Sequence, residues 1–495
     1  MLRHQEGRLA EADTLYRQSL ELEPDNLQAL RLCGILARER NDFSTSIKLL
    51  RQAAVIAPTD ARCTSELAIS EMASGDLESA ESSFRRALSC DPESRRALAN
   101  LGALLQRRGH LHEAISLHQQ YLELEPTDLE VRCNLANALM DAGLGREALE
   151  ECEEALTIAP EHPLVLGNKG AVLCGLEKFE SASRVLESAV TANPEDELAL
   201  INLGYARSQL QQYDSAAEAL RQALVLSPDN ARASADLAGV LLNAGRPDQA
   251  IEVCEHFLER HPGERLTLAA YAFALHDCGR EEEAHSILNY DELIQVIDID
   301  TPPGYSDVSD FNDAIAAFVQ AHPSLVASPV SKATTGGDQT GELNMGQSED
   351  LSVLADLIDK TVREVALRWQ SAGFSNHPAM AYATDSWLLR VWGVVLTEGG
   401  FQAPHLHPLG WLSGVYYLRL PPEMEDDREK AGWLEFGMPP KRLSAVSPPG
   451  LHAVKPKAGR LVLFPSYFHH RTRPFVSEQP RISIAFDVVP ALSGG

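Results

Sequence analysis

The stretch "ALANLGALLQRRG" at residues 97–109, followed by "EAISLHQQYLEL" at residues 113–124, decides the fold of the first part of the chain. In both segments apolar residues recur at intervals of three and four, which is the spacing of one face of an α-helix. Gly109 separates the segments at a turn position. Pro126 follows the second segment, where a helix cannot continue. The stretch therefore predicts a helical hairpin.

The same hairpin pattern recurs every 34 residues along the first 290 residues. Small residues mark the places where two helices cross closely, turn residues separate the two helices, and a proline follows the second helix. Such tandem hairpins stack into a superhelix with a concave groove. The crossing positions are Gly34, Ala68, Gly102, Ala136, Gly170, Gly204, Ala238 and Ala272; the turn positions are Gly7, Asn41, Gly75, Gly109, Gly143, Glu177, Gln211, Gly245 and Gly279; the prolines are Pro24, Pro58, Pro92, Pro126, Pro160, Pro194, Pro228 and Pro262.

The period and this pattern of small residues and prolines resemble the tetratricopeptide repeat, over about residues 1–290. The resemblance implies an all-α superhelical domain whose groove binds peptides. The first hairpin lacks most of its first helix, since only six residues precede Gly7. We therefore expect that the chain is a shortened form of a longer array.

One register of the repeat is a candidate peptide clamp. It lies two residues before the crossing position, which faces the groove in the family that the repeats resemble. An asparagine amide carries both a donor and an acceptor and can pair with the backbone of an extended peptide. The alternative is that asparagine is simply common at this position. The register contains Asn100, Asn134, Asn168 and Asn202, and Asp236 continues it.

After about residue 290 the 34-residue period ends. We expect a linker over residues 291–310 and a second domain over residues 311–495. Helices are predicted at the start of that domain, and a long polar loop, a candidate lid, is predicted over residues 328–350. Short runs rich in β-branched and aromatic residues then predict strands at 386–396, 411–420, 432–436, 451–456, 459–465 and 481–489. This is the pattern of an α+β domain built on a sandwich or jelly roll, with helices against its outer face.

Composition limits the classes of function. The chain has 495 residues, too many for one hydrophobic core, and a formal net charge of −28, which disfavours non-specific binding to nucleic acid. It contains no run of about 18 apolar residues and no apolar signal segment at its start, so we expect a cytoplasmic protein without a membrane partner. The eight cysteines are all within the repeats, without CxxC spacing, and are expected to be reduced packing residues.

Histidines of the second domain indicate a metal site. His405 and His407 stand two residues apart, so that both side chains point to the same side of an extended chain. His469 and His470 follow about 65 residues later, and one of them can reach the first two from a distant strand of a closed sheet. Three ligands on one face leave the remaining coordination positions open for substrate and dioxygen. Because side chains alternate along a strand, the other histidine of that pair is expected to point away from the site, and the lone His452 is expected to be structural.

The runs "HLHP", "WLSGVYYL", "GRLVLFPSYFHHRTRPF" and "RISIAFDV" are similar to those of iron(II)- and 2-oxoglutarate-dependent dioxygenases, over about residues 300–490. The resemblance implies a double-stranded β-helix (jelly roll), Fe(II) and 2-oxoglutarate as cofactors, and His405 and His470 as iron ligands. It also implies that Arg481 binds the distal carboxylate of 2-oxoglutarate, with help from Ser483. The whole chain would then be an enzyme that hydroxylates a protein or peptide recruited by the repeat groove.

Position 407 departs from this family, most of whose members carry Asp or Glu there. A ligating His407 makes a three-histidine site that lacks one negative charge, unless a carboxylate such as Glu398 or Glu435 approaches it; His407 outside the ligand set is the other possibility. This departure leaves room for a non-catalytic interaction scaffold with a degenerate jelly roll. A three-histidine dioxygenase that needs no 2-oxoglutarate is disfavoured, because it would have no use for Arg481 and Ser483.

Overall fold

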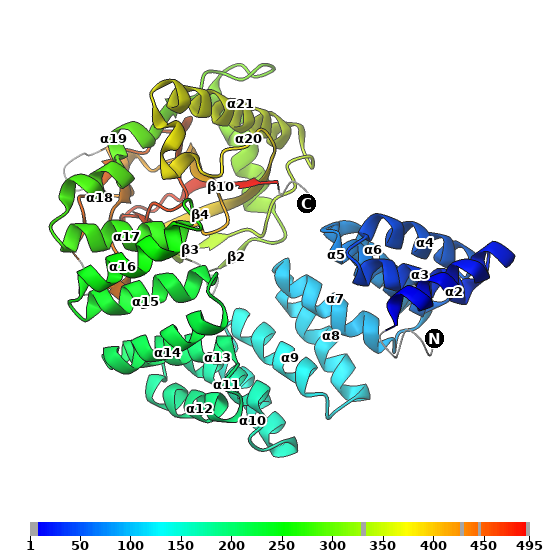
Figure 1. Cartoon of the computed structure of the whole chain (residues 1–495). Helices are drawn as coiled ribbons and strands as arrows, with labels where there is room; N and C mark the ends of the chain where they lie inside the picture. The colour runs from blue at the N-terminus through cyan, green and yellow to red at the C-terminus, as the bar shows by residue number, and fades with distance from the viewer. Residues whose placement is uncertain (1–7, 328–332, 426–429, 444–446, 492–495) are drawn as a thin grey trace. The chain divides into compact units, whose positions relative to one another are not determined.

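The computed structural model describes residues 8–327, 333–425, 430–443 and 447–491 (Figure 1). They fall into two compact units, Met1–Pro160 and Glu161–Gly495. The first unit contains repeats alone, whereas the second contains further repeats and the sheet domain. The division of the chain into repeats up to residue 290 and a second domain from residue 311 remains a prediction.

The repeat region is a series of helical hairpins, as the sequence predicts. Each first helix begins 34 residues after its counterpart in the preceding hairpin, and so does each second helix. The first helices are α3 (Leu27–Glu39), α5 (Ala61–Ala73), α7 (Arg95–Arg107), α9 (Leu129–Asp141), α11 (Pro163–Gly175), α13 (Glu197–Gln209), α15 (Ala231–Asn243) and α17 (Arg265–Asp277). The second helices are α2 (Leu9–Leu22), α4 (Phe43–Ile56), α6 (Leu77–Cys90), α8 (Leu111–Leu124), α10 (Gly145–Ile158), α12 (Phe179–Ala192), α14 (Tyr213–Leu226), α16 (Pro247–Leu258) and α18 (Glu281–Leu288), after which comes the short α19 (Tyr290–Leu293).

The predicted turn positions have the backbone conformation that ends a helix. From residue 41 to residue 279, the residue at every one of these positions has a positive φ angle. Glycine adopts this conformation without strain, which explains its frequency in the register. Asn41, Glu177 and Gln211 adopt it as well, with φ between 55° and 60°. The turn conformation is therefore kept even where the residue is not glycine.

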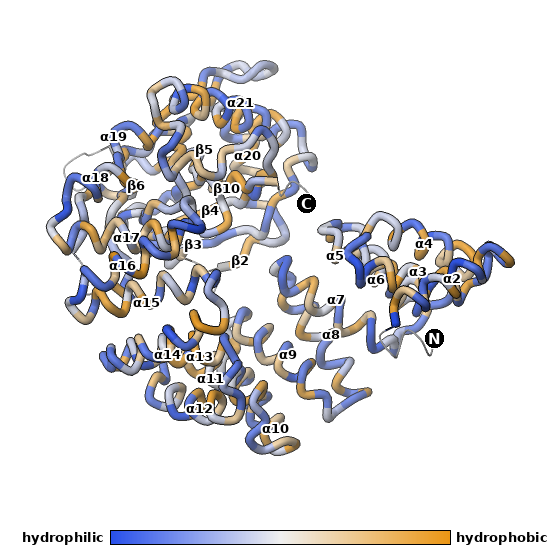
Figure 2. The backbone as a smooth tube through the Cα atoms, in the orientation of Figure 1, coloured by the Kyte–Doolittle hydropathy of each residue, from blue (hydrophilic) through white to orange (hydrophobic). Residues whose placement is uncertain are grey.

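The predicted crossing positions are the points of closest helix contact. A Cβ atom added at Gly204 would lie 2.6 Å from Cγ of Leu220, and one added at Gly34 would lie 2.6 Å from Cγ of Leu50. Both leucines are fully buried. Figure 2 shows apolar and polar positions interspersed along the repeat helices.

We expect Gly204→Ala to destabilise the unit that contains residues 161–495 by about 1–3 kcal/mol, because the new methyl group overpacks the contact with Leu220. Chemical denaturation of the full chain would measure the loss. Gly167→Ala is the matched control: it lies in the helix of another repeat, and its added Cβ would meet its nearest atom at 3.4 Å. Equal stability changes in the two variants would contradict this account of the crossing position.

The C-terminal domain is an antiparallel sheet that closes to a nearly barrel-shaped form, consistent with the predicted jelly roll. Its strand order is β1-β8-β5-β10-β4-β9-β6-β7, with β3 also paired to β4 and β2 paired to β3. The long β4 pairs through its first half with β10 and near its end with β9, so it belongs to both sides of the roll. The strands are β1 (Gln295–Asp298), β2 (Val326–Ala327), β3 (Thr334–Gln339), β4 (Trp387–His405), β5 (Leu412–Arg419), β6 (Leu434–Phe436), β7 (His452–Val454), β8 (Arg460–Pro465), β9 (His470–Thr472) and β10 (Arg481–Pro490).

Each strand predicted from the sequence is present, and further strands appear. β1 lies inside the segment expected as a linker and pairs with β8. β3 has the polar sequence "TTGGDQ" and lies inside the segment expected as a loop. Its composition does not predict a strand, but its pairing with β4 makes it one. Residues 328–332 of that expected loop, like Gly7 of the repeats, lie outside the described residues.

Helices cover the outer face of the sheet, also as predicted. They are α20 (Val308–Ala321) and α21 (Glu349–Ser371). The Tyr416 hydroxyl on β5 donates a hydrogen bond to Oδ1 of Asn312 on α20 at 2.7 Å. Gly393 on β4 leaves room for Val319 of the same helix.

Short 3₁₀ helices complete the domain: η1 (Phe374–Asn376), η2 (Pro378–Met380), η3 (Pro422–Glu425) and η4 (Lys441–Leu443). Across the described residues, no helix combines the length and the apolar character that crossing a bilayer requires.

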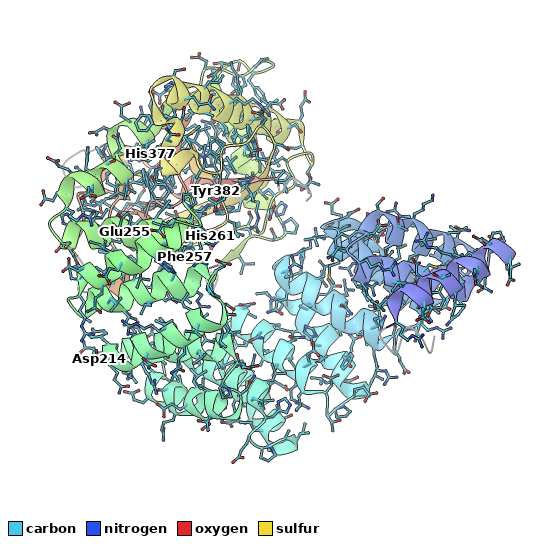
Figure 3. The ribbon with its side chains drawn as sticks, viewed as in Figure 1. Asp214, Glu255, Phe257, His261, His377 and Tyr382 are labelled. Carbon is cyan, nitrogen blue, oxygen red and sulfur yellow. The ribbon has the colours of Figure 1, made fainter. Side chains whose placement is uncertain are left out.

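The last repeats contact the sheet domain within the second unit. The Arg265 side chain, at the start of α17, donates from Nε to the carbonyl oxygen of Gly410 at 2.8 Å and stacks on the ring of Tyr382, with Cζ 3.8 Å from the ring centroid. His377 lies with Nε2 2.9 Å from the carbonyl oxygen of Ser286 on α18. Figure 3 labels Tyr382 and His377, which both come from the segment after α21. The sheet domain is therefore joined to the repeats by side chains from several segments.

Candidate metal centre

Strand pairing brings two of the predicted ligands together. His405 is the last residue of β4 and pairs in register with His470, the first residue of β9, so that the ring centroids lie 4.3 Å apart. His407 follows two residues after the end of β4, and its backbone N–H donates to the carbonyl oxygen of Ser466 at 3.1 Å. This hydrogen bond holds the loop that carries His407 against the end of β8.

The three predicted histidines form one cluster. A candidate ligand atom from each of His405, His407 and His470 lies within 4.8 Å of the others. The ring of His407 is 5.1 Å from that of His405 and 5.2 Å from that of His470, measured between centroids. The side chains that the sequence pattern predicts as a set are therefore adjacent in space.

The rings of His405 and His470 make the same hydrogen bond, from Nδ1 to a backbone carbonyl two residues earlier. Nδ1 of His405 lies 2.8 Å from the carbonyl oxygen of Ala403, and Nδ1 of His470 lies 3.0 Å from that of Phe468. A carbonyl oxygen only accepts, so Nδ1 carries the proton in both rings and Nε2 keeps its lone pair. This is the tautomer of a histidine that binds a metal through Nε2.

Burial keeps these imidazoles neutral. It lowers the pKa of His405 to about 4, with a smaller contribution from the neighbouring His407. Burial also lowers the pKa of His470 well below its ordinary value, helped by the proximity of His405. A neutral imidazole binds a metal ion without first releasing a proton. The donor set therefore fits a divalent metal of the imidazole-binding class, which includes iron.

The carboxylate nearest to the cluster is Asp487 on β10, which sequence reasoning missed. Nδ1 of His407 lies 3.0 Å from Oδ2 of Asp487 and 2.9 Å from its Oδ1. The expected alternatives lie elsewhere: Glu435 pairs with Arg471, and Glu398 is exposed. A signal for Asp487 does exist in "RISIAFD", because alternate residues of a strand share a face and residues 481, 483 and 487 are on the same one.

Arg481 is a buried cation without an acidic partner. Arg481 is 1% exposed, and its Nη1 donates to Oγ of Ser483 at 3.2 Å. Its Cζ lies 4.9 Å from the ring centroid of Tyr417. Among the described residues, Nε of Arg481 has no hydrogen-bond partner, the Tyr417 hydroxyl lies beside the guanidinium, and no carboxylate pairs with this cation. A buried guanidinium that has no carboxylate partner is suited to bind an anionic ligand.

The two remaining histidines of interest lie outside the cluster, as expected. His469 packs against Phe273 of α17, with ring centroids 5.3 Å apart, and burial lowers its pKa to about 3. His452 on β7 lies 3.7 Å from Asp291. Both side chains therefore belong to packing around the sheet domain.

The asparagine register of the repeats differs from one repeat to the next. The Asn100 amide donates to the carbonyl oxygen of Arg96 in its own helix at 2.8 Å, and Asn202 is only 7% exposed. Asn134 and Asn168 are partly exposed. A peptide clamp formed by these residues stays a prediction.

The next position of that register is occupied by the chain itself. Asp236 binds Arg442 of η4 at 2.8 Å, and Nδ2 of Asn243, also on α15, donates to the carbonyl oxygen of Arg442 at 2.8 Å. Leu443 lies over Gly239 on the same helix, where an added Cβ would be 2.8 Å from its Cδ2. This face of α15 thus holds a basic and an apolar side chain and one backbone carbonyl.

Comparison with known families agrees with this division of the chain. Residues 390–487 match the family described as "Putative 2OG-Fe(II) oxygenase". Two descriptions of the tetratricopeptide repeat match residues 4–61 and 65–128 and residues 105–167 and 207–268. The oxygenase match contains His405, His407, His470, Arg481, Ser483 and Asp487.

Solved structures resemble the repeats. The chain is 22% identical to one in the APC/C hetero-tetramer Cut9-Hcn1 (TM-score 0.42), over 54% of this chain and 52% of that one. It is 18% identical to yeast Tom70 (TM-score 0.43; 55% and 59% covered) and 26% identical to a thermophilic tetratricopeptide repeat protein of Thermus thermophilus (TM-score 0.33; 37% and 99% covered). It thus spans about half the length of the first of these chains.

No match was found among curated proteins. The family matches nevertheless fall in both parts of the chain: on the repeats within residues 4–167 and 207–268, and on residues 390–487 of the sheet that carries the histidines. The chain therefore joins a tetratricopeptide repeat array to a C-terminal domain of the family described as "Putative 2OG-Fe(II) oxygenase".

Proposed function

We propose that this protein is an Fe(II)- and 2-oxoglutarate-dependent oxygenase that hydroxylates a protein or peptide substrate recruited by its repeats. One observation carries the proposal: three clustered histidines lie in a domain whose buried Arg481 lacks any acidic partner in the described residues. A metal ion would bind the three histidines, and a dicarboxylate would supply the negative charge that Arg481 lacks.

The residues present fit both cofactors of the family. His405, His407 and His470 would hold Fe(II) through Nε2, and Arg481 would bind the distal carboxylate of 2-oxoglutarate with two parallel N–H donors. When bound, Fe(II) and 2-oxoglutarate supply the activation of dioxygen, with release of succinate and carbon dioxide. Ser483 fixes the guanidinium of Arg481 through the contact at Nη1. The Tyr417 side chain lies against the same guanidinium, with its ring centroid 4.9 Å from Cζ of Arg481, and would be a further donor to the co-substrate.

The interior of the roll is built to exclude water. Val394 and Leu396 on β4 share the strand face that carries Trp392, and they form a buried cluster with Met424 and Phe475. Apolar surroundings of this kind would keep water from the reacting groups and strengthen a charge contact between Arg481 and a carboxylate. The chain would thus provide orientation and apolar surroundings for the cofactors.

The repeats lie against the segments that carry the histidines, which supports a role in delivering the substrate. Through Arg265, α17 holds Gly410, three residues after His407. Through Phe273, the same helix contacts His469, the neighbour of His470. A peptide held by the repeats of this unit would therefore be close to the candidate metal centre.

The test is formation of succinate from 2-oxoglutarate by the full chain, with Fe(II) and ascorbate present. We expect turnover, even without a substrate, above that of a metal-free control, because the slow uncoupled reaction needs only the cofactors, dioxygen and ascorbate as the reductant. Mass spectrometry would report a gain of one oxygen on peptides that bind the repeats. No succinate from protein with a full complement of metal would reject the proposal.

A non-catalytic scaffold remains the competing proposal, because position 407 lacks the usual carboxylate. Calorimetry with 2-oxoglutarate and Zn(II), which supports binding without redox chemistry, separates the two. Binding that depends on both the metal and Arg481 supports the oxygenase. Absence of any 2-oxoglutarate binding supports the scaffold.

A further inference from the structure

We infer that Asp487 is a positioning residue that supplies, through His407, the negative charge that a carboxylate ligand provides in most relatives. This inference rests on the proposed function, since it concerns the same metal centre. Asp487 lies on the central strand β10 and is 7% exposed. It bonds Nδ1 of His407 and therefore acts on the metal through the imidazole ring.

The surroundings of Asp487 direct its charge toward His407. On β5, Ser413 is opposite Asp487 and donates from Oγ to its Oδ1 at 2.7 Å. The Ser413 hydroxyl also lies 2.8 Å from that of Ser466, which holds it in place. On β4, the residue opposite is Arg390, and this arginine pairs with Glu342 at 3.0 Å. Within the described residues, Asp487 forms no ion pair with Lys or Arg, and its contact at 2.9 Å is with Nδ1 of His407.

The ring of His407 is also held in one orientation. Trp392 on β4 stacks on it, with the centroids 5.6 Å apart and the planes 15° from parallel. The hydrogen bond to Asp487 fixes the rotation of the ring from the other direction. With Nδ1 protonated by this contact, Nε2 is the nitrogen that remains to bind a metal, as in His405 and His470.

The electrostatic consequence follows from these contacts. Three neutral imidazoles give a metal ion no charge compensation, whereas two histidines and one carboxylate give one negative charge. A carboxylate that accepts the Nδ1 proton raises the basicity of Nε2 in the same ring. Asp487 therefore retains the net charge of the usual ligand set but places it one residue farther from the metal. This resolves the missing charge at position 407 without requiring Glu398 or Glu435.

The test is calorimetric titration of the metal-free full chain with Mn(II), with Co(II) absorption as a second readout that does not depend on activity. We expect Asp487→Asn, which has nearly the same shape, to weaken metal binding about 10–100-fold. Glu342→Gln is the matched control, since it removes a carboxylate of the same domain that pairs with Arg390 instead of a histidine. It should bind Mn(II) as the wild type does.

A charge exchange separates an electrostatic role from a structural one. The double variant His407→Asp with Asp487→Asn moves the carboxylate into the ligand position, and we expect it to recover most of the affinity lost in Asp487→Asn. A role of Asp487 in packing alone would leave that loss unrepaired. If Asp487→Asn does not fold, the double variant is compared with His407→Asp alone, and it should bind Mn(II) at least as tightly.

The outcomes distinguish this inference from the proposed function. Equal Mn(II) affinity in the wild type and Asp487→Asn overturns the inference and leaves the oxygenase proposal in place. The inference is also overturned if the double variant binds Mn(II) as weakly as Asp487→Asn does. In the comparison with His407→Asp, it is overturned if the double variant binds at least about 10-fold more weakly. A wild type that binds neither Mn(II) nor Co(II) rejects the oxygenase proposal itself.

Discussion

His470→Ala is expected to abolish tight metal binding and all metal-dependent turnover while the repeats remain folded. His470 is the distant member of the cluster, paired with His405 on β4 and with Phe436 on β6. Its removal leaves two imidazoles that are close in sequence and no ligand from the other side. The loss in metal affinity should exceed the roughly 10–100-fold cost of losing an outer partner of a ligand. Calorimetry with Mn(II) and succinate formation measure the two effects.

His469→Ala is the matched control for that variant. It removes the adjacent histidine, whose ring packs on Phe273 of the repeats. We expect it to lower stability through lost packing but to keep metal binding. Circular dichroism would confirm that both variants retain the helical signal of the repeats. Tight metal binding by His470→Ala, combined with its loss in His469→Ala, would show that the distal ligand has been assigned to the wrong histidine.

The register of the repeats could be predicted because its determinants are local. The period of 34 residues appears in the sequence as small residues, turn residues and prolines, and the helices begin at the same interval. Gly204 and Leu220 are only 16 residues apart and lie in the same hairpin. The need for a small residue at position 204 therefore arises within one repeat. Little of this depends on the rest of the chain.

The sheet domain could be predicted only in part because its pairings are distant. His405 and His407 were found from their spacing, and His470 from a resemblance. The alternation in "RISIAFD" places Asp487 on the same strand face as Arg481, but its contact with His407 depends on β10 lying beside β4, a pairing that the local sequence does not specify. β3 escaped prediction for a related reason, since a polar segment with two glycines is a strand here through its pairing with β4. Sheet closure therefore determined the features that sequence patterns did not.

The second large effect is expected at Arg481. Arg481→Ala should raise the 2-oxoglutarate concentration needed for half-maximal succinate formation by at least about 100-fold, the cost of roughly 3 kcal/mol for a lost charge-assisted contact. Its affinity for Mn(II) should stay unchanged, because the guanidinium is not one of the candidate ligands. Arg481→Lys should recover only part of the loss, since an ammonium group cannot form the two parallel contacts of a guanidinium.

Arg390→Ala is the matched control, because Arg390 lies on the neighbouring β4 but pairs with the exposed Glu342. Stability gives an independent readout. In the absence of ligand, the buried guanidinium of Arg481 has Ser483 as its hydrogen-bond partner and no acid among the described residues, so its charge is poorly compensated. We therefore expect Arg481→Met to be at least as stable as the wild type without 2-oxoglutarate, and to lose the thermal stabilisation that 2-oxoglutarate gives the wild type. A strongly destabilised Arg481→Met with an unchanged 2-oxoglutarate requirement would instead identify Arg481 as a structural residue of the roll.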